Sequence, residues 1–404
     1  MLPQLGHELQ VSRTRDEDAR SRFVMNLRDY VLNDVARQMQ DTYKSRRDAL
    51  ARRDEDVPAD GDDVHDLLID EPIFKFYSAV RYNAQEMCHR AVIPAIDRQR
   101  EDLSKRAAAL SSERDVGGTL TLDPEFQVPR YVEGIDVHLM PGSYVAGDDN
   151  GDARGGALYD NAISIFAFGR LGKHMDDIGW SMSKFVRQTF ADFKPKKILD
   201  VGCTIGHNTL PWAQVFPDAE VHAVDVAAPV LRYAHARAQS LGVPVHFSQQ
   251  SAEDLKFEDN SFDLVFSSMF LHELPLAAIK NFLREARRVL KPGGLMLNME
   301  LPPNCHMHPY DQFYLDWDSR YNNEPFYKTF RDQNCPELCV EAGFPRDTFF
   351  HAAVPQYTIV KEDKFKDLIR INPNAEMLAK TGTLAEDCVH RYCFGAWKQS
   401  SGGN

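Results

Sequence analysis

The sequence predicts an α/β protein in which a doubly wound, mostly parallel sheet follows a helical N-terminal extension. Between about residues 195 and 300, short apolar runs alternate with helical patterns. The runs are ILDVG, VHAVDV, VHFSQQ, FDLVFSS and LMLNME, and the helical patterns include PVLRYAHARAQSLG and AIKNFLREARRVL. Strands that alternate with helices at this spacing form βαβ units, in which neighbouring strands run parallel.

The first part of the chain has a different pattern, which is helical throughout. Residues 17–53 carry apolar side chains at helical spacing, and residues 64–109 form a second helical block with breaks at Pro72 and Pro94. The periodic residues of the first block are Phe23, Leu27, Val31, Val35 and Met39. This region contains no chemical motif. We therefore expect residues 1–118 to form a helical domain that serves as a cap or as a dimerisation module.

Two further segments complete the predicted organisation. Residues 119–190 begin irregularly, are rich in turn residues and then form two helices separated near Gly172, so we expect a cap that contacts the substrate. Residues 191–400 hold the sheet, with an aromatic-rich insertion at 302–332. A chain of 404 residues is long enough for more than one such unit.

Composition excludes several classes of partner. The chain has 43% hydrophobic and 26% charged residues, which is typical of a globular protein. Its net charge of −13 comes from 60 acids against 47 bases, and no run of Lys and Arg is free of acids, so we expect no nucleic acid partner. No stretch of 18 uninterrupted apolar residues is present, so we expect no membrane span.

The N-terminal sequence and the cysteines favour a cytoplasmic location. The start MLPQLGHELQ lacks the basic and apolar regions of a secretory signal. The seven cysteines are odd in number and scattered along a large chain, which is typical of reduced thiols rather than of a disulfide framework.

Small and acidic residues gather where the first strand of the sheet ends. In ILDVGCTIG, Asp200, Gly202 and Gly206 lie at a turn from strand to helix. In an open parallel sheet, ligands bind at the carboxyl ends of the strands, and a glycine turn lets the backbone approach them. The spacing differs from the dinucleotide-binding G-x-G-x-x-G pattern, because Thr204 and His207 occupy its later glycine positions.

The following strands end in residues of the same kind. Asp225 ends the second strand, where its carboxylate can accept hydrogen bonds from both hydroxyls of a ribose. Ser251, Ala252 and Glu253 follow the third strand, and the fourth reads FDLVFSSMFLHEL. Any one of these segments could be an ordinary strand end. Their order and spacing together indicate a ligand site.

These segments resemble the successive motifs of the class I S-adenosylmethionine-dependent methyltransferases. They are most similar to the small-molecule group that includes the ubiquinone- and menaquinone-biosynthesis methyltransferases. The resemblance covers about residues 190–300 and continues weakly to CFGAWK near the end. It implies a Rossmann-like, seven-stranded sheet and S-adenosylmethionine as the cofactor, with S-adenosylhomocysteine as the product.

The resemblance also implies which residues contact the cofactor. Asp200, Gly202 and Gly206 would surround its methionine end, Asp225 would bind the ribose, Ala252 and Glu253 would flank the adenine, and Ser267 and Met269 would line the path to the sulfonium. Their neighbours Cys203, Val226 and Ser251 complete the predicted cofactor-binding set. Thr204 stands where that group usually has glycine. Because threonine disfavours a positive φ, we expect the loop to have a different shape here.

The implied reaction moves a methyl group to a small organic acceptor by in-line displacement. The protein then has to align the acceptor and exclude water, and it needs a base only if the acceptor must lose a proton. His272, three residues after Met269, is the nearest basic candidate for this catalytic role. It could equally pack on the sheet or cap a turn.

The acceptor site is expected on either side of the cofactor motifs. In the insertion, Tyr310, Phe313, Tyr314 and Trp317 follow one helical face, which could cover an apolar or cationic acceptor or pack against the N-terminal helices. Tyr144 and Tyr159, before the first strand, are the other candidate substrate residues.

Other functions have weaker support in the sequence. Cys305, His306 and His308 lie too close together, without a partner motif, to predict a metal site. Thiol-based arsenic chemistry would need Cys335, Cys339, Cys388 and Cys393 to converge. The two rival functions are a methyltransferase acting on protein or another macromolecule, and a catalytically silent interaction module that keeps the fold.

Overall fold

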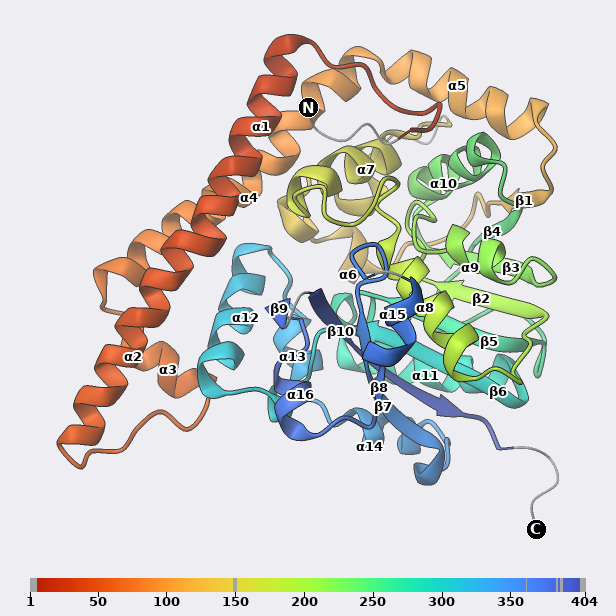
Figure 1. Cartoon of the computed structure of the whole chain (residues 1–404). Helices are drawn as coiled ribbons and strands as arrows, with labels where there is room; N and C mark the ends of the chain where they lie inside the picture. The colour runs from red at the N-terminus through yellow and green to blue at the C-terminus, as the bar shows by residue number, and fades with distance from the viewer. Residues whose placement is uncertain (1–5, 148–150, 361, 383, 386–387, 400–404) are drawn as a thin grey trace.

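The structure, a computed structural model, describes residues 6–147, 151–360, 362–382, 384–385 and 388–399. A mixed sheet with helices on both faces forms the centre of the molecule, and the N-terminal helices run along one side of it (Figure 1). The strand order along the sheet is β1-β4-β3-β2-β5-β6-β10-β7-β8, and β9 pairs with β10 off this path. The strands are β1 Gly118–Thr121, β2 Lys197–Val201, β3 Glu220–Asp225, β4 Val245–Gln249, β5 Phe262–Ser268, β6 Leu290–Glu300, β7 Phe349–Pro355, β8 Arg370–Ile371, β9 Leu384–Ala385 and β10 Cys388–Trp397.

The five apolar runs that predicted the sheet are all strands, β2 to β6, and all their mutual pairings are parallel. They are buried on both faces: Ile198 packs in the core on one side of β2, and Leu199 packs in the core on the other. Because the strands run in the same direction, β2, β3 and β5 all end at one edge of the sheet. The predicted α/β class with a mostly parallel centre is therefore confirmed.

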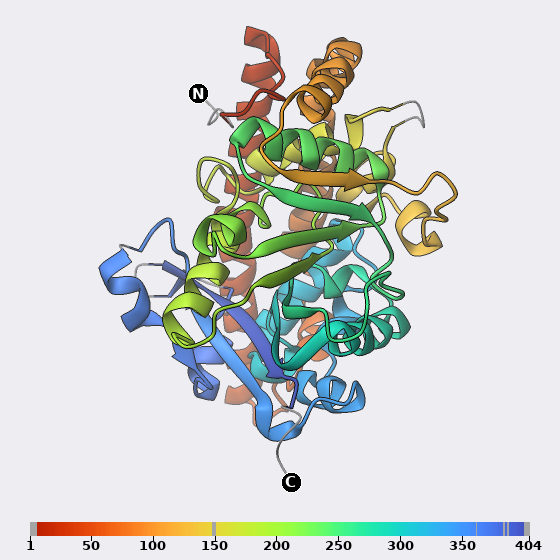
Figure 2. The same cartoon turned by 90° about the vertical axis from the view of Figure 1, so that its right-hand side faces the viewer.

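The expected number of seven strands is wrong for this sheet, which has ten strands among the described residues. Figure 2 shows the strands side by side, from β1 at one edge to β7 and β10 towards the other. β10 lies antiparallel between β6 and β7, and β1 extends the parallel edge by pairing with β4. β1, β8 and β9 contain only two to four residues, which is too short for hydrophobic alternation to reveal them in the sequence.

The N-terminal region is built from long helices. The helices of this region are α1 Arg15–Tyr30, a π-helical turn Val31–Val35, α2 Ala36–Arg52, α3 Gly61–Leu68, α4 Pro72–Arg98 and α5 Arg100–Glu113. A capping box between Thr14 and Glu17 starts α1. Pro72 begins α4 as expected, whereas Pro94 lies inside α4 and does not end it. The buried neighbours Ala95 and Ile96 hold this part of α4 against the core.

The predicted apolar face of the first helix is correct except at its start. Val31, Val35 and Met39 are buried, but Phe23 is 58% exposed and its neighbour Val24 is buried in its place. The buried face therefore begins one residue later than the sequence pattern suggested.

The N-terminal helices share their cores with the rest of the chain. Ala91, Leu103 and Leu110 pack in one cluster with Tyr233 and Ala236 of α10 (Ala228–Leu241), the helix that follows β3. A second cluster joins α1, α2, α3 and α4 to α12 (Pro309–Tyr321), which lies beside them in Figure 1. Removal of these helices would expose apolar surface on both α10 and α12.

The remaining helices cover the sheet or bridge it to the N-terminal region. They are α6 Arg130–Glu133, α7 Arg154–Phe166, α8 Asp177–Thr189, α9 Leu210–Val215, α11 Leu276–Val289, α13 Tyr327–Arg331, α14 Cys335–Glu341, α15 Glu362–Leu368 and α16 Ala375–Ala379. In the part of the chain that the structure describes, no helix combines the length and the apolar character needed to cross a membrane.

Candidate active site

The loop after β2 is shaped by three residues with positive φ. Gly202 has φ 76°, Thr204 φ 46° and Gly206 φ 68°. A Cβ on Gly202 would lie 2.3 Å from Cδ2 of Phe270, so no other residue fits there without movement. The sequence predicted a loop of different shape at Thr204, because threonine disfavours a positive φ. The threonine adopts that conformation, at a cost of roughly 1–2 kcal/mol.

Asp225 holds the strained loop in place. The backbone N–H of Thr204 donates to Oδ2 of Asp225 at 2.9 Å, and the N–H of Ala227 donates to Oδ1 at 3.0 Å. Burial raises the pKa of this carboxyl group more than these backbone bonds lower it. Each oxygen can still accept a further hydrogen bond, because a carboxylate oxygen has two lone pairs.

A small cavity of about 40 Å³ lies against this carboxylate. Its lining includes the predicted residues Gly202, Asp225, Val226 and Ala252. The sequence analysis did not single out the rest of the lining, which is Tyr131, Val132, Val201, Val224, Gln250, Phe270 and Leu274. One carboxylate in an otherwise mostly apolar groove suits a flat ring system attached to a hydroxylated sugar.

A large cavity of about 380 Å³ adjoins the small one, and Gly202 lines both. The predicted residues Tyr144, Tyr159, Asp200, Cys203, Met269 and His272 all line it. Its walls come from the 119–190 segment, from the carboxyl ends of β2, β5 and β6, and from the 302–332 insertion. The structure therefore brings together residues of the predicted cap, of the cofactor motifs and of the aromatic-rich insertion.

Asp200 lies on the floor of the large cavity and is almost fully buried. The hydroxyl of Thr209 donates to Oδ2 of Asp200. Burial raises the pKa of this carboxyl group to about 7, with a smaller contribution from the neighbouring Asp225. A carboxyl group in this state would gain from a positively charged ligand group placed beside it.

His272 is held by a buried carboxylate. Its Nδ1 lies 2.6 Å from Oε2 of Glu300, and Oε1 of Glu300 accepts the backbone N–H groups of Phe270 and Leu271. Burial alone would lower the pKa of His272, but the charge and hydrogen bond of Glu300 raise it to about 9. Glu300 fixes the ring through Nδ1, and Nε2 lies 4.0 Å from Oε1 of Glu273.

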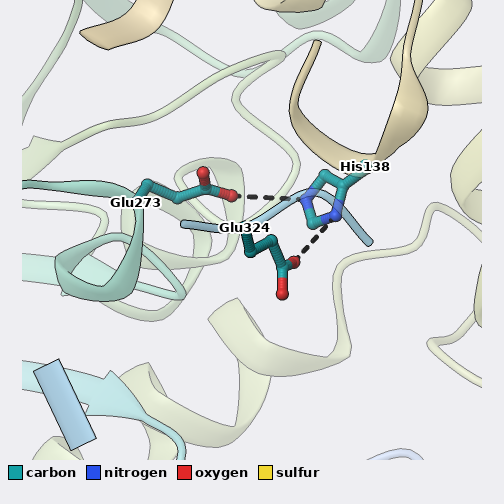
Figure 3. A group of neighbouring side chains, drawn as sticks. All are labelled: His138, Glu273 and Glu324. Carbon is teal, nitrogen blue, oxygen red and sulfur yellow. Dashed lines mark ion pairs between the residues drawn. The ribbon is translucent and has the colours of Figure 1, made fainter. Parts of the chain in front are cut away.

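A second buried group lies in the same cavity and is drawn in Figure 3. Nε2 of His138 lies 3.3 Å from Oε1 of Glu273, and its Nδ1 lies 2.9 Å from Oε1 of Glu324. Burial lowers the pKa of His138, but the two carboxylates raise it to about 10. The hydroxyl of Tyr144 also donates to Oε1 of Glu273, at 3.3 Å.

Several predicted cofactor residues line neither cavity. Ser267 donates to Oδ1 of Asn298 inside the sheet, and its neighbour Ser268 lines the large cavity in its place. Successive side chains of a strand point to opposite faces, so a shift of one residue reverses the assignment. Glu253 accepts hydrogen bonds from Tyr131 and Asn281. Ser251 accepts the N–H of Glu253, and Gly206 lies under Phe247.

The aromatic face of the insertion also lies away from the large cavity. Tyr310, Tyr314 and Trp317 pack against the N-terminal helices, where the ring of Trp317 lies 4.2 Å from that of His65 and 5.5 Å from that of Phe74. The end of α12, the loop after it and the start of α13 line the cavity, through Asp318, Ser319, Asn322, Glu324 and Tyr327.

The cysteine and histidine groups considered from the sequence do not form a site. Among the described residues, the group of His, Cys, Asp and Glu side chains close enough to share a metal is His138, Glu273 and Glu324, which includes none of Cys305, His306 and His308. Cys335 and Cys339 pack on one side of the sheet and Cys393 on the other, so these thiols do not converge.

The residues that sequence analysis missed are those that act across long separations. His138 lies in an irregular segment, Glu300 ends β6, and Glu324 lies between two short helices of the insertion. Glu300 at the carboxyl end of a parallel strand was the one detectable signal, because ligand sites form at that edge.

Comparison with known proteins supports the motif assignment. The profile of a family described as "Methyltransferase domain" matches residues 198–294. A demethylmenaquinone methyltransferase of Thermus thermophilus is 36% identical over 109 residues, which is 27% of this chain and 49% of that protein. A fatty-acid O-methyltransferase of Mycolicibacterium smegmatis is 30% identical over 126 residues, or 31% of this chain and 44% of that protein.

These matches cover only part of this chain and part of the proteins it matches. The chain spans about half the length, or less, of the first curated relatives it matches. Among solved structures, a putative O-methyltransferase from Nostoc punctiforme is 21% identical with a TM-score of 0.38, and covers 56% of this chain and 59% of that one.

Proposed function

We propose that this chain, whose residues 198–294 form a class I S-adenosylmethionine-dependent methyltransferase domain, transfers a methyl group from S-adenosylmethionine to a small organic acceptor. The motifs predicted the family and the cofactor, and the matches confirm both. The acceptor class and the in-line course of the transfer are part of the proposal.

The observation that carries the proposal is that Gly202 lines both cavities. The small cavity offers Asp225 for the ribose hydroxyls and the apolar Ala252 and Phe270 for the adenine. The large cavity offers Asp200 for the ammonium group of the methionine end, and Cys203 and Met269 line the way to the acceptor. The charges of these residues and their order along the two cavities support S-adenosylmethionine as the ligand.

Bound S-adenosylmethionine supplies a methyl group that its sulfonium has already activated. The protein therefore has to align the acceptor with that group and exclude water. Tyr144, Tyr159 and Tyr327 enclose the large cavity from two sides and would do both. The enclosure supports a small acceptor rather than a protein chain.

His272 is the residue that would take a proton from the acceptor. Glu300 holds its Nδ1 at 2.6 Å, and the residue lines the large cavity together with Met269. The carboxylate would stabilise the imidazolium formed when Nε2 accepts a proton, as the oriented histidine of a hydrolase triad does. The large cavity would thus hold donor, acceptor and base together.

Titration with S-adenosylmethionine tests the proposed function directly. Asp225→Ala should weaken binding by ~2–3 kcal/mol, because two charge-assisted hydrogen bonds to the ribose are lost. Asp254→Ala is the matched control. This exposed carboxylate lies two residues after Ala252 in the sequence, but it lines neither cavity. Isothermal titration of the three proteins measures the effect. Equal dissociation constants for wild type and Asp225→Ala would show that the cofactor binds elsewhere.

The domain division remains part of the proposal: residues 1–118 as a helical unit, 119–190 as a cap and 191–400 as the catalytic domain. Because α5 and α10 share one hydrophobic core, we propose that the helical unit stabilises α10 behind the cofactor site. A homodimer through the N-terminal helices is proposed with it.

A further inference from the structure

We propose that Glu273 and Glu324, bridged by His138, anchor a positively charged nitrogen of the acceptor. This inference rests on the proposed function, because it assigns part of the same large cavity to acceptor recognition. The juxtaposition that carries it is visible in Figure 3, where two carboxylates from distant segments lie on either side of one imidazole ring.

The charges of this cluster do not balance. Glu273 and Glu324 share the single imidazole of His138, which can neutralise only one of them. Two cations that line the cavity have carboxylates of their own: His272 pairs with Glu300 and Arg391 with Asp177. Behind the cavity wall, Arg81 pairs with Asp318, and Arg28 lies over the ring of Phe166 with no ion pair among the described residues. Within the cluster itself two carboxylates face one imidazole, so a second positive charge in this site would be favourable.

An unsatisfied oxygen locates this charge. Oε2 of Glu324 is buried and has no hydrogen-bond partner among the described residues, and the residue as a whole is 6% exposed. Glu324 lines the large cavity. Nearly all buried polar atoms in native proteins have a partner, so this oxygen indicates a ligand group that donates a hydrogen bond.

The surroundings favour an organic cation. Tyr144 and Tyr159 line the same cavity, and their rings lie 5.9 Å apart. Aromatic faces attract ammonium groups, most strongly where water is excluded. A carboxylate and an aromatic wall together form a site for an aminoalkyl or protonated heterocyclic group.

A metal ion suits this geometry less well. The two carboxylates lie at different ring nitrogens of His138, Glu273 at Nε2 and Glu324 at Nδ1. The three side chains lie close enough to share a metal ion, but one metal ion can bind only one nitrogen of a ring, so one of the two carboxylates would have to turn away from its present partner nitrogen. The raised pKa of His138 adds a competing proton that a metal would have to displace.

Matched pairs of small ligands test the inference. Protein saturated with S-adenosylhomocysteine would be titrated with benzylamine, 2-phenylethylamine and tryptamine at pH 7.5, and with the alcohol that corresponds to each. We expect at least one ammonium compound to bind about 10-fold more tightly than its alcohol, because it forms a charge-assisted hydrogen bond. Glu324→Gln should abolish that preference while leaving the affinity for S-adenosylhomocysteine unchanged.

Two controls make the result decisive. Glu337→Gln changes an exposed, ion-paired glutamate in the same way and should keep the preference. The melting temperature of each variant, compared with that of the wild type, shows whether it is folded. If Glu324→Gln fails to fold, Glu273→Gln takes its place in the amine titration. Equal binding of amines and alcohols, or an unchanged preference in a folded Glu324→Gln protein, would overturn the inference.

Titration with MnCl₂ distinguishes the remaining interpretation. Binding of Mn²⁺ that Glu324→Gln removes, without any preference for amines, would overturn the organic cation in favour of a metal. Failure of S-adenosylhomocysteine to bind the wild-type protein would instead refute the proposed function. The amine titration on the protein alone would still decide whether the anchor exists.

Discussion

The proposed donor side and the proposed acceptor side of the large cavity are built in different ways. The donor side consists of consecutive loops after β2, β3 and β4, each carrying a candidate cofactor residue close to a strand end. The acceptor side joins His138, Glu273 and Glu324 from three segments that only the tertiary fold brings together. Local sequence therefore specifies the donor side, whereas the acceptor side depends on how the cap and the insertion pack.

The electrostatics of the two sides also differ. On the donor side, Asp200 and Asp225 have no cationic partner among the described residues, and burial raises the pKa of both carboxyl groups. On the acceptor side, the imidazoles of His138 and His272 each lie against carboxylates, which raise the pKa of His138 to about 10 and of His272 to about 9. A cationic cofactor would supply the missing charge on the donor side, and the acceptor side would take part of its charge from the substrate.

The largest expected effect separates chemistry from cofactor binding. His272→Ala should lower turnover by ~10²-fold or more, because the base that accepts the acceptor's proton is lost. The affinity for S-adenosylmethionine should stay nearly constant, since the donor residues are untouched. Release of S-adenosylhomocysteine, measured with an acceptor from the amine series, gives the rate.

The pH dependence sharpens this test. The pKa of His272 is raised to about 9, so its neutral form, which can accept a proton, increases as pH rises towards 9. Turnover of the wild type should therefore rise over that range, and the rise should disappear in His272→Ala. A mutant profile of unchanged shape would remove His272 from the mechanism and indicate an acceptor that is already nucleophilic.

A smaller effect is expected at the far face of the insertion. Trp317→Ala should lower the free energy of unfolding by about 2 kcal/mol, because the half-buried indole packs against His65 and Phe74. Acceptor and cofactor affinities should hold, since Trp317 does not line the large cavity. Denaturant unfolding and titration measure the two quantities. If Trp317→Ala instead binds the acceptor more weakly and keeps its free energy of unfolding, the insertion would act as a lid over the acceptor.

The sequence predicted the donor side residue by residue wherever one local motif decided the geometry. Asp200, Gly202, Asp225, Ala252 and Met269 all line a cavity. Ser267 lines neither cavity and donates to Asn298 instead, because strand phase cannot be predicted to one residue when both faces of a strand are buried.

The acceptor side could not be predicted from the sequence, because its contacts join segments that are far apart in the chain. His138 has φ 58° in an irregular turn, and nothing in the local sequence reveals that its ring meets Glu324. The aromatic pattern of the insertion predicted a buried helical face correctly, but a buried face does not identify its partner. The amphipathic pattern was satisfied by the N-terminal helices, which left the polar side of α12 to line the cavity.

The smallest expected effect concerns the strain on the donor side. Thr204 holds a positive φ so that its N–H can reach Asp225, and glycine adopts that conformation without the clash of a Cβ. Thr204→Gly should therefore stabilise the fold by about 0.5–1 kcal/mol, after the larger backbone entropy of glycine in the unfolded chain is subtracted.

The N–H donor of residue 204 remains in this variant, so cofactor affinity should hold or rise slightly. The threonine hydroxyl contributes little, because its oxygen lies 3.5 Å from Nδ1 of His207. Thr204→Ala is the matched control: it removes the hydroxyl but keeps the Cβ, and so keeps the strain. Denaturant unfolding should rank the glycine variant above the wild type and the alanine variant near it. If both variants lose stability equally, the hydroxyl outweighs the strain, and the donor loop is shaped by side-chain contacts as much as the acceptor side is.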